Sequence, residues 1–492
     1  MFQRITPEQA GLPSASAEAF VRALERRGLV MHSVLLMKGT DIFAEGYWSP
    51  FREDLCHRMY SQTKSFVGVA IGLLEEDGKL RLDDRICTYF PDKLTRELPV
   101  YLQELTIRQM LTMRTCGGAP GWFLSPETDR TRLYFAENRA DHPAGTQWKY
   151  DSAGSQVLSA LVERLAGKSL LAFLDERIFR HLGTFRTAEI LKTKNDDSWG
   201  DSALLCTTRD MASFARFVMN GGVWEGKRLM NEGYLRQAVS CLADNDREGF
   251  DGAFTQGYGY LIWKVPGGFA FNGMGGQLTL CLPQQDLIFS CTGDNQGFAA
   301  AKDLILSAFY EYIADPMQAS PLPEDPSAFA RYRALEEGLT LSCLRGPTAS
   351  PMAGLLNGKT FICEENPMGI REFSLSFGPD GTGVWRYVNA QGGKQLPFGL
   401  GKNVFGKFPQ TGYSGLHGGL PDEHGCLYDC AVSAAWRQED KLALKVQIID
   451  RYLGNLYVVF SFREDLAFVT MTKHAEQFLN EYSGQLLARM EV

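Results

Sequence analysis

Residues 61–74 read SQTKSFVGVAIGLL, a serine and a lysine three positions apart followed by a run of small and apolar residues. The apolar run predicts a buried helix that ends near Gly78. Ser61 and Lys64 would then lie on one face of the helix, one turn apart, at its N-terminus. There the unpaired N–H groups and the helix dipole stabilise negative charge. A serine hydroxyl needs a base to become a nucleophile, and a neighbouring lysine can supply one. Chance alone also produces this spacing in a long chain, so the prediction depends on further partners.

The composition excludes several classes of protein. The chain has 492 residues, of which 45% are hydrophobic, and a formal net charge of −8, so two or three domains are expected. It has no run of Lys and Arg residues, which argues against a nucleic-acid partner. The N-terminus lacks a signal-peptide core and no apolar stretch is long enough to span a bilayer, which predicts a cytoplasmic protein without a membrane partner. The eleven cysteines are scattered, so we expect free thiols and no metal site.

The period of the apolar residues changes at a proline-rich segment, residues 314–334, which we interpret as a linker. Residues 1–313 alternate helical patterns with strands, as in helices packed on an antiparallel sheet. Residues 335–492 alternate apolar and polar positions between turns, which predicts an antiparallel, lipocalin-like β-barrel. A helix over residues 475–489 is expected to close the chain. The predicted fold class is therefore α+β, an antiparallel sheet flanked by helices, followed by an all-β barrel-like domain.

A second segment could supply a base for Ser61. Tyr150 follows a turn and precedes a predicted helix that begins at Ser152. A tyrosine hydroxyl can act as a general base when a neighbouring cation, here Lys64, favours the phenolate. A half-buried structural tyrosine would explain this segment equally well.

A third segment, residues 272–278, is rich in glycine. Glycines at the start of a strand allow a ligand to approach the backbone closely. A backbone N–H group of this segment, together with that of Ser61, could form an oxyanion hole. The alternative is a tight turn or a bulge with no role in chemistry.

The order and spacing of these three segments resemble the serine β-lactamase and penicillin-binding-protein-like family, most closely its class C and esterase-like branch. The resemblance covers roughly residues 5–312. Flanking phrases at residues 80–91, 105–113, 143–146 and 257–260 support it. Agreement among several independent segments is far more specific than any one of them.

The resemblance implies a role for each residue of the three motifs. Ser61 would be the acylated nucleophile, Lys64 its proton acceptor or electrostatic activator, and Tyr150 the general base for acylation and for the attacking water. The backbone N–H groups of Ser61 and Gln277 would form the oxyanion hole. Such acyl transfer proceeds through a covalent acyl-enzyme, and we expect no cofactor.

Two positions depart from the family pattern. Ser152 stands where asparagine is usual, and Met274 begins the Met274-Gly275-Gly276 motif where lysine or histidine is usual. These four residues remain candidates for binding the substrate, but Ser152 is shorter than asparagine and Met274 removes a group that would meet a substrate carboxylate. The sequence therefore predicts a serine hydrolase for a small ester, amide or peptide, with weak or no β-lactamase activity. The alternative is a non-catalytic, penicillin-binding-like module that binds or senses a ligand.

Overall fold

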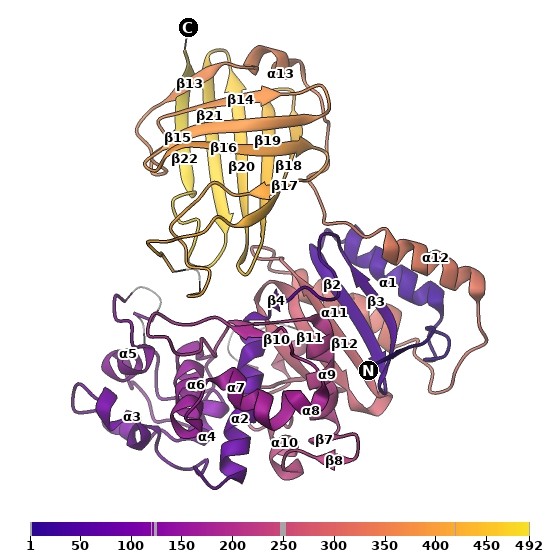
Figure 1. Ribbon diagram of the computed structural model, residues 1–492, viewed down its shortest axis with the longest axis vertical. Coiled ribbons are helices and arrows are strands. Elements are labelled where there is room, and N and C mark those ends of the chain that lie inside the picture. The colour runs from indigo at the N-terminus through magenta and orange to yellow at the C-terminus, as the bar shows by residue number, and fades with distance from the viewer. Residues whose placement is uncertain (1, 120, 123–124, 247–251, 419, 492) are drawn as a thin grey trace. The chain divides into compact units, whose positions relative to one another are not determined.

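The computed structural model describes residues 2–119, 121–122, 125–246, 252–418 and 420–491. The chain divides into two compact units, Met1–Thr340 and Leu341–Val492 (Figure 1). The first unit has a seven-stranded sheet with helices on both faces, and the second has a β-barrel. The predicted fold class is thus confirmed. No helix in the described part of the chain combines the length and apolar character needed to cross a bilayer.

The sheet of the first unit is antiparallel except at one edge, where β1 pairs with β3 in parallel. Strands β2, β11 and β12 at its centre are buried almost throughout, because helices cover both faces. The strand order is β1 (Gln3–Arg4), β3 (Asp41–Tyr47), β2 (Met31–Lys38), β12 (Leu287–Gly293), β11 (Gln277–Leu282), β10 (Gly268–Gly273) and β9 (Trp263–Val265).

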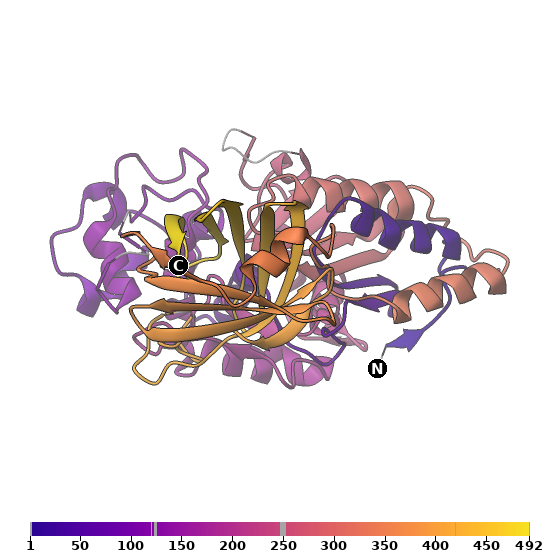
Figure 2. The same cartoon turned by 90° about the horizontal axis from the view of Figure 1, so that it is seen from above.

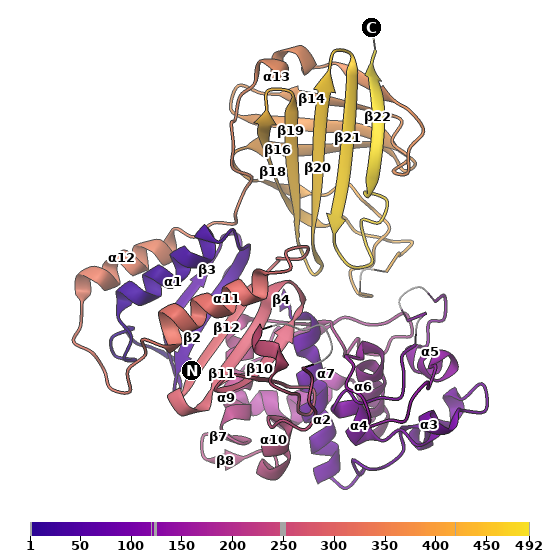
Figure 3. The same ribbon diagram turned by 180° about the vertical axis from the view of Figure 1, so that it is seen from behind.

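Aromatic contacts fix the helices on the two faces of this sheet. On one face, Phe289 of β12 meets Phe20 of α1 (Ser14–Arg26) and stacks on Phe309 of α11 (Ala301–Phe309). On the other face, Phe214 of α9 (Thr208–Met219) contacts Phe271 of β10. Figure 3 shows α11 in front of the sheet, and Figure 1 shows α9 on the opposite side.

Helix α2 (Thr63–Glu76) confirms the buried helix predicted after Ser61. Every residue from Thr63 to Leu74 is buried. Its two glycines make this packing possible, since a Cβ at Gly72 would lie 2.4 Å from the Tyr234 ring and one at Gly68 would lie 2.7 Å from the Tyr260 carbonyl. Gly78 follows the helix with a φ of 69°, the left-handed conformation that commonly ends a helix.

Shorter elements surround α2 and the sheet edge. The helices are α3 (Val100–Gln103), α4 (Ile107–Leu111), α5 (Arg130–Glu137), α6 (Ser152–Ala166), α7 (Leu170–Leu174), α8 (Arg180–Leu182) and α10 (Glu232–Ala238). Two small sheets consist of β4 (His57–Arg58), β6 (Leu204–Cys206) and β5 (Glu189–Ile190), and of β7 (Val223–Trp224) and β8 (Lys227–Arg228). Of these, α6, α7 and α10 pack directly on α2.

The barrel of the second unit closes where β16 pairs in parallel with β18. The alternation of buried and exposed residues along β15 is the period of two that predicted it. Trp385, Tyr387 and Phe460 form part of its aromatic interior. The order around the barrel is β16 (Gly392–Leu400), β15 (Thr382–Asn389), β14 (Glu372–Phe377), β13 (Thr360–Cys363), β22 (Gly484–Met490), β21 (Leu466–His474), β20 (Leu453–Arg463), β19 (Lys441–Ile449) and β18 (Asp429–Gln438), with β17 (Val404–Lys407) beside β18 and α13 (Pro351–Leu356) before β13.

Two predicted boundaries are wrong. The helix expected over residues 475–489 does not form, because residues 484–490 are strand β22, which pairs with both β13 and β21. Its Leu486 and Ala488 are buried at alternate positions, so tertiary pairing overrides local helix propensity.

Part of the predicted linker is also helical. Helix α12 (Pro326–Glu337) begins with Pro326, and the Asp325 side chain caps it by accepting from the Ala328 N–H at 2.9 Å. Proline is well tolerated at this first helical position, so proline content misled the prediction. Helix α12 packs beside α1, as Figure 2 also shows.

Candidate active site

Ser61 lies in η1 (Tyr60–Gln62), a single 3-10 turn that runs directly into α2. Tyr60 just before it has a φ of 47°, a left-handed conformation that strains a non-glycine residue. The Thr63 hydroxyl stabilises this turn, because it donates to the Tyr60 carbonyl at 2.6 Å and accepts from the Leu204 N–H at 3.1 Å. Backbone strain of this kind clusters at functional sites.

Lys64 makes the contact with Ser61 that the spacing predicts. Its Nζ donates to Ser61 Oγ at 3.1 Å and to the Asp201 carbonyl at 2.6 Å. The Asp201 carboxylate also lies 3.8 Å from Nζ, and the Lys64 and Asp201 side chains are 1% and 3% exposed. The two side chains thus form a buried ion pair. Lys64 is therefore held between the serine and an anion.

Tyr150 is the third side chain that the structure brings to this place. Lys64 Nζ lies 5.0 Å from the centroid of the half-buried Tyr150 ring. Trp263 of β9 also stacks on the Tyr150 ring, with a centroid distance of 5.7 Å and an interplanar angle of 24°. A cation at an aromatic face is attracted by the ring quadrupole. The ring of Tyr150 is thus positioned by both Lys64 and Trp263.

The residues after Tyr150 anchor it to α6. Asp151 caps the helix by accepting from the Gly154 N–H at 2.9 Å. Burial raises the pKa of the Asp151 carboxyl above its usual range, although this hydrogen bond opposes the shift. Ser152 is the first residue of α6, directly after the cap. The start of this helix therefore fixes both Tyr150 and Ser152 in position.

The glycine-rich segment approaches Ser61 from the sheet. Met274, Gly275 and Gly276 form a short turn between β10 and β11, and the two glycines have φ values of 77° and 94°. A Cβ at Gly273 would lie 2.3 Å from the Met59 carbonyl, so only glycine fits there. Both β10 and β11 contact η1. The structure thus brings all three motifs to the start of α2.

Gln277 begins β11, and its side chain is fully occupied with the backbone. Its Nε2 donates to the Met274 and Gly293 carbonyls at 2.8 Å each, and its Oε1 accepts from the Gly293 N–H at 3.0 Å. These bonds hold the turn against β12. Any contact of Gln277 with a ligand would therefore come from its backbone.

Asp201 is the part of this site that sequence reasoning missed. It lies 137 positions after Lys64, in a segment with no motif of its own. A local pattern cannot reveal a contact made across such a distance in the chain. Together these residues present a hydroxyl, a buried amine with its counter-ion and a phenol, a set of groups that can support acyl transfer.

A buried histidine pair lies beside the segment that carries Ser61. His57 of β4 has Nδ1 3.0 Å from the Arg58 carbonyl and Nε2 2.8 Å from His32 Nδ1. Since a carbonyl only accepts, His57 Nδ1 carries the proton, and Nε2 accepts from His32. Burial lowers the pKa of His57 to about 4. Protonation of His57 would place two N–H donors, His57 Nε2 and His32 Nδ1, against each other.

This pair predicts a dependence of stability on pH. The folded His57 has a lower pKa than an unfolded histidine, near 6.5, so the unfolded state binds more protons between these values. The contribution of neutral His57 to the free energy of unfolding is complete above pH 6.5. About 3 kcal/mol of it is lost as the pH falls towards 4. We expect His57→Asn to flatten the dependence of the free energy of unfolding on pH over this range. The measurements are urea unfolding and pulsed hydrogen exchange of peptides from residues 55–66. The exposed His424 offers a control, because His424→Asn should leave the slope unchanged; an equal slope in His57→Asn would contradict the assignment.

Comparisons with known proteins identify the fold. The Beta-lactamase family profile matches residues 17–308, more than half of the chain. A 6-aminohexanoate-dimer hydrolase of Paenarthrobacter ureafaciens is 26% identical over 253 residues, 47% of this chain and 64% of that protein. Esterase EstB of Burkholderia gladioli is 26% identical over 203 residues, 36% of this chain and 51% of that protein.

The chain thus spans less than two thirds of these two relatives. A Bacillus anthracis structure, provisionally assigned as a 6-aminohexanoate-dimer hydrolase, superimposes with a TM-score of 0.54 at 18% identity, over 66% of this chain and 89% of that one. At this identity the likeness concerns the fold. The family resemblance predicted from the three motifs is confirmed. The chain belongs to the Beta-lactamase family.

Proposed function

We propose that this chain is a serine hydrolase that cleaves a small ester or amide through an acyl-Ser61 intermediate. The observation that carries the proposal is the 3.1 Å contact between Lys64 Nζ and Ser61 Oγ at the strained start of α2. The names of two relatives, a dimer hydrolase and an esterase, agree with hydrolysis of an amide or an ester. A small molecule is therefore the partner we expect at this site.

In the proposed mechanism, Ser61 Oγ attacks the carbonyl carbon and its proton passes to Tyr150. The C–O or C–N bond of the substrate then breaks, and Tyr150 returns the proton to the alcohol or amine that leaves. The Asp201 carboxylate lies 3.8 Å from Lys64 Nζ, so we assign Lys64 chiefly to electrostatic activation of Ser61 and of the Tyr150 phenolate. The same tyrosine would deprotonate the water that hydrolyses the acyl-enzyme. The backbone N–H groups of Ser61 and Gln277 are the donors we assign to the oxyanion.

The departures at Ser152 and Met274 shape the expected substrate range. The thioether of Met274 offers neither a charge nor a hydrogen bond donor to a substrate carboxylate. We therefore expect uncharged p-nitrophenyl esters to react faster than a chromogenic cephalosporin, which carries a carboxylate. The same departures favour the second candidate, a module that binds a ligand without turnover.

The proposal is tested by labelling with a fluorophosphonate or a fluorescent penicillin and by mapping the adduct with mass spectrometry. We expect the adduct on Ser61 and none in Ser61→Ala. The matched control is Ser65→Ala, on the same helix, which removes only the hydrogen bond to the Leu261 carbonyl and should still be labelled. Tight ligand binding without labelling or turnover would favour the binding module, and an adduct on another residue would refute the assignment.

Tyr150→Phe isolates the phenolic hydroxyl. The ring should remain against Trp263 and Lys64, because both contacts involve its face. We expect the rate of Ser61 acylation to fall by about 10²–10⁴-fold, the usual contribution of a general base. The measurement is the labelling rate against pH, with Tyr258→Phe as a control for the loss of a buried tyrosine hydroxyl nearby. A rate within a few fold of the unmodified protein would exclude Tyr150 as the base.

A further inference from the structure

The segment that follows β12 is bonded to the glycine-rich turn of the candidate active site. Asn295, the second residue after this strand, is 6% exposed. Its backbone N–H and its Nδ2 both donate to the Gly275 carbonyl, at 2.9 and 3.2 Å. The same Nδ2 donates to the Val30 carbonyl at 3.2 Å, and Oδ1 accepts from the Val30 N–H at 2.8 Å. One buried amide thus ties the turn to the residue before β2.

The surroundings of the Asn295 amide are closely packed and fully hydrogen-bonded. A Cβ at Gly293 would lie 3.1 Å from Asn295 Nδ2, and one at Gly276 would lie 3.2 Å from it. Nδ2 donates twice and Oδ1 accepts once, so neither end of the amide is buried without a partner. An aspartate would lack the two donors, and a leucine would lack donors and acceptor alike. These bonds account for an asparagine at this position.

Every carbonyl of the turn accepts from a buried side chain. The pairs are Met274 with Gln277 Nε2 at 2.8 Å, Gly275 with Asn295 Nδ2 at 3.2 Å, and Gly276 with Cys291 Sγ at 3.4 Å. The C=O and N–H groups of a trans peptide point in opposite directions, so the N–H group after each carbonyl is directed away from these side chains. Gly275 is left-handed, with φ 77° and ψ 5°. Successive N–H groups in such turns form concavities that bind anions.

The same part of the chain also contacts the segment that carries Ser61. A Cβ at Gly273, just before the turn, would lie 2.3 Å from the Met59 carbonyl. Gln296 Nε2 lies 3.5 Å from the hydroxyl oxygen of Tyr60, the strained residue before Ser61. A shift of the turn would therefore change its distance from the nucleophile.

We infer that Asn295 is a positioning residue for the oxyanion hole. By holding the Gly275 carbonyl, it fixes the direction of the N–H groups of the turn, among them the Gln277 N–H that we assign to the oxyanion. Donors that are fixed before the reaction stabilise the developing charge without reorganisation, which makes them effective. Asn295 itself does not touch the substrate. The inference rests on the proposed function, because it needs a serine that is acylated.

The test compares Asn295→Ala with the unmodified full-length protein. The variant removes the bonds of the amide but keeps the backbone N–H that donates to the Gly275 carbonyl. We expect the rate constant of fluorophosphonate labelling of Ser61 to fall by about 10–100-fold. The affinity for phenylboronic acid should fall by a similar factor, because the serine oxygen bonds to boron and a boron hydroxyl occupies the oxyanion position. The midpoint of the pH profile of labelling should not move, since Lys64 and Tyr150 are unchanged.

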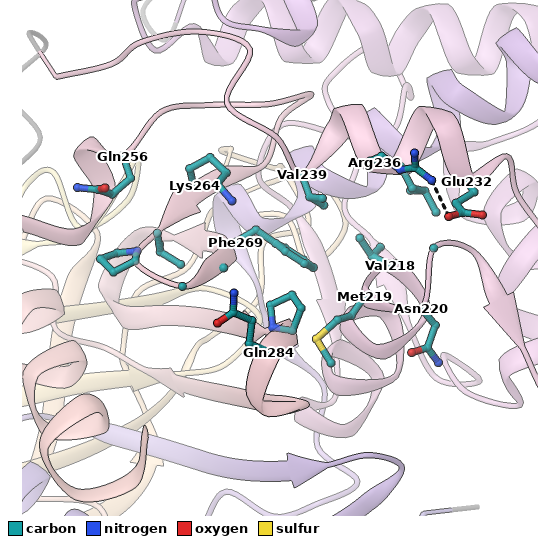
Figure 4. Close-up of a pocket in the computed structure, with 17 residues that line it drawn as sticks. Val218, Met219, Asn220, Glu232, Arg236, Val239, Gln256, Lys264, Phe269 and Gln284 are labelled. Carbon is teal, nitrogen blue, oxygen red and sulfur yellow. Dashed lines mark hydrogen bonds and ion pairs between the residues drawn. The ribbon is translucent and has the colours of Figure 1, made fainter. Parts of the chain in front are cut away.

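The matched control is Gln284→Ala, which removes an amide at the other end of the β11–β12 hairpin. Gln284, labelled in Figure 4, lines a cavity of about 840 Å³. Its loss should leave the labelling rate and the boronic acid affinity within about twofold of the original values, because the cavity is lined by none of the three motifs within the described ranges.

Three results in Asn295→Ala would overturn the inference: an unchanged labelling rate, a slower rate with unchanged boronic acid affinity, or a slower rate with a displaced pH midpoint. The last would mean that Asn295 acts on the base. The rate constant does not depend on the folded fraction, which the end point of labelling gives. Asn295→Ser, which keeps a hydroxyl donor, should lose less than Asn295→Ala and decides in the same way if the alanine variant does not fold. Failure of the proposed function is distinct, because the unmodified protein itself would then be neither labelled at Ser61 nor bound by the boronic acid.

Discussion

Lys64→Met is expected to slow acylation of Ser61 by about 10²–10⁴-fold. The variant removes the ammonium that donates to Ser61 Oγ but retains most of the volume of the buried side chain. Without it, the serine alkoxide loses the ammonium beside it, and a Tyr150 phenolate loses the cation that lies 5.0 Å from its ring centroid. The measurement is the rate of fluorophosphonate labelling, followed by mass spectrometry of the Ser61 peptide.

The same variant should also destabilise the first unit, because it removes the ammonium that lies 3.8 Å from the buried Asp201 carboxylate. Removing one partner of such a pair commonly costs about 3–5 kcal/mol. We expect Lys64→Met/Asp201→Asn to recover most of that stability but none of the labelling rate, since the second substitution removes the buried carboxylate charge and does not restore the ammonium. Recovery of labelling in the double variant would show that Lys64 acts through stability and not through chemistry. Lys79→Met, which affects only a hydrogen bond to the Leu165 carbonyl, serves as the control.

Gly273→Ala is expected to damage the site from the side of the sheet. The added Cβ would lie 2.3 Å from the Met59 carbonyl and 2.9 Å from the Gln277 Cβ. Relief of this overlap must displace the segment that carries Ser61 or the start of β11. We expect labelling to slow by about 100-fold, since a displacement of 1 Å at a reacting group has an effect of this size. Overpacking should also lower the free energy of unfolding by about 1–3 kcal/mol.

The measurements are the labelling rate and the urea midpoint read from peptides of residues 55–66. Gly406→Ala is the matched control, because it also places a methyl group in a strand but no atom lies within 4 Å of its Cβ. Normal labelling in Gly273→Ala would show that β10 and the Ser61 segment are not coupled, and the oxyanion hole would need another donor.

Local patterns predicted the parts of this molecule that depend on local geometry. The three-residue spacing of Ser61 and Lys64 predicted their contact, because a turn brings such residues together wherever it occurs. Alternating burial likewise predicted the barrel strands. The role of Asp201 could not be predicted from the sequence, since its contact with Lys64 depends on how the chain returns to α2. Strand β22 was misread as helix because its two neighbours, β13 and β21, determine its conformation.

The complete burial of α2 has a consequence for how this chain can evolve. Most substitutions between Thr63 and Leu74 should destabilise the fold, because every side chain there is packed. Tyr150, Ser152 and Met274 belong to other elements and are only partly buried, so they can change with less effect on the core. Mutational libraries for new substrates should therefore spare the helix and diversify its neighbours. Helix α2 would then change little among related proteins, and new substrate ranges would arise from residues around it.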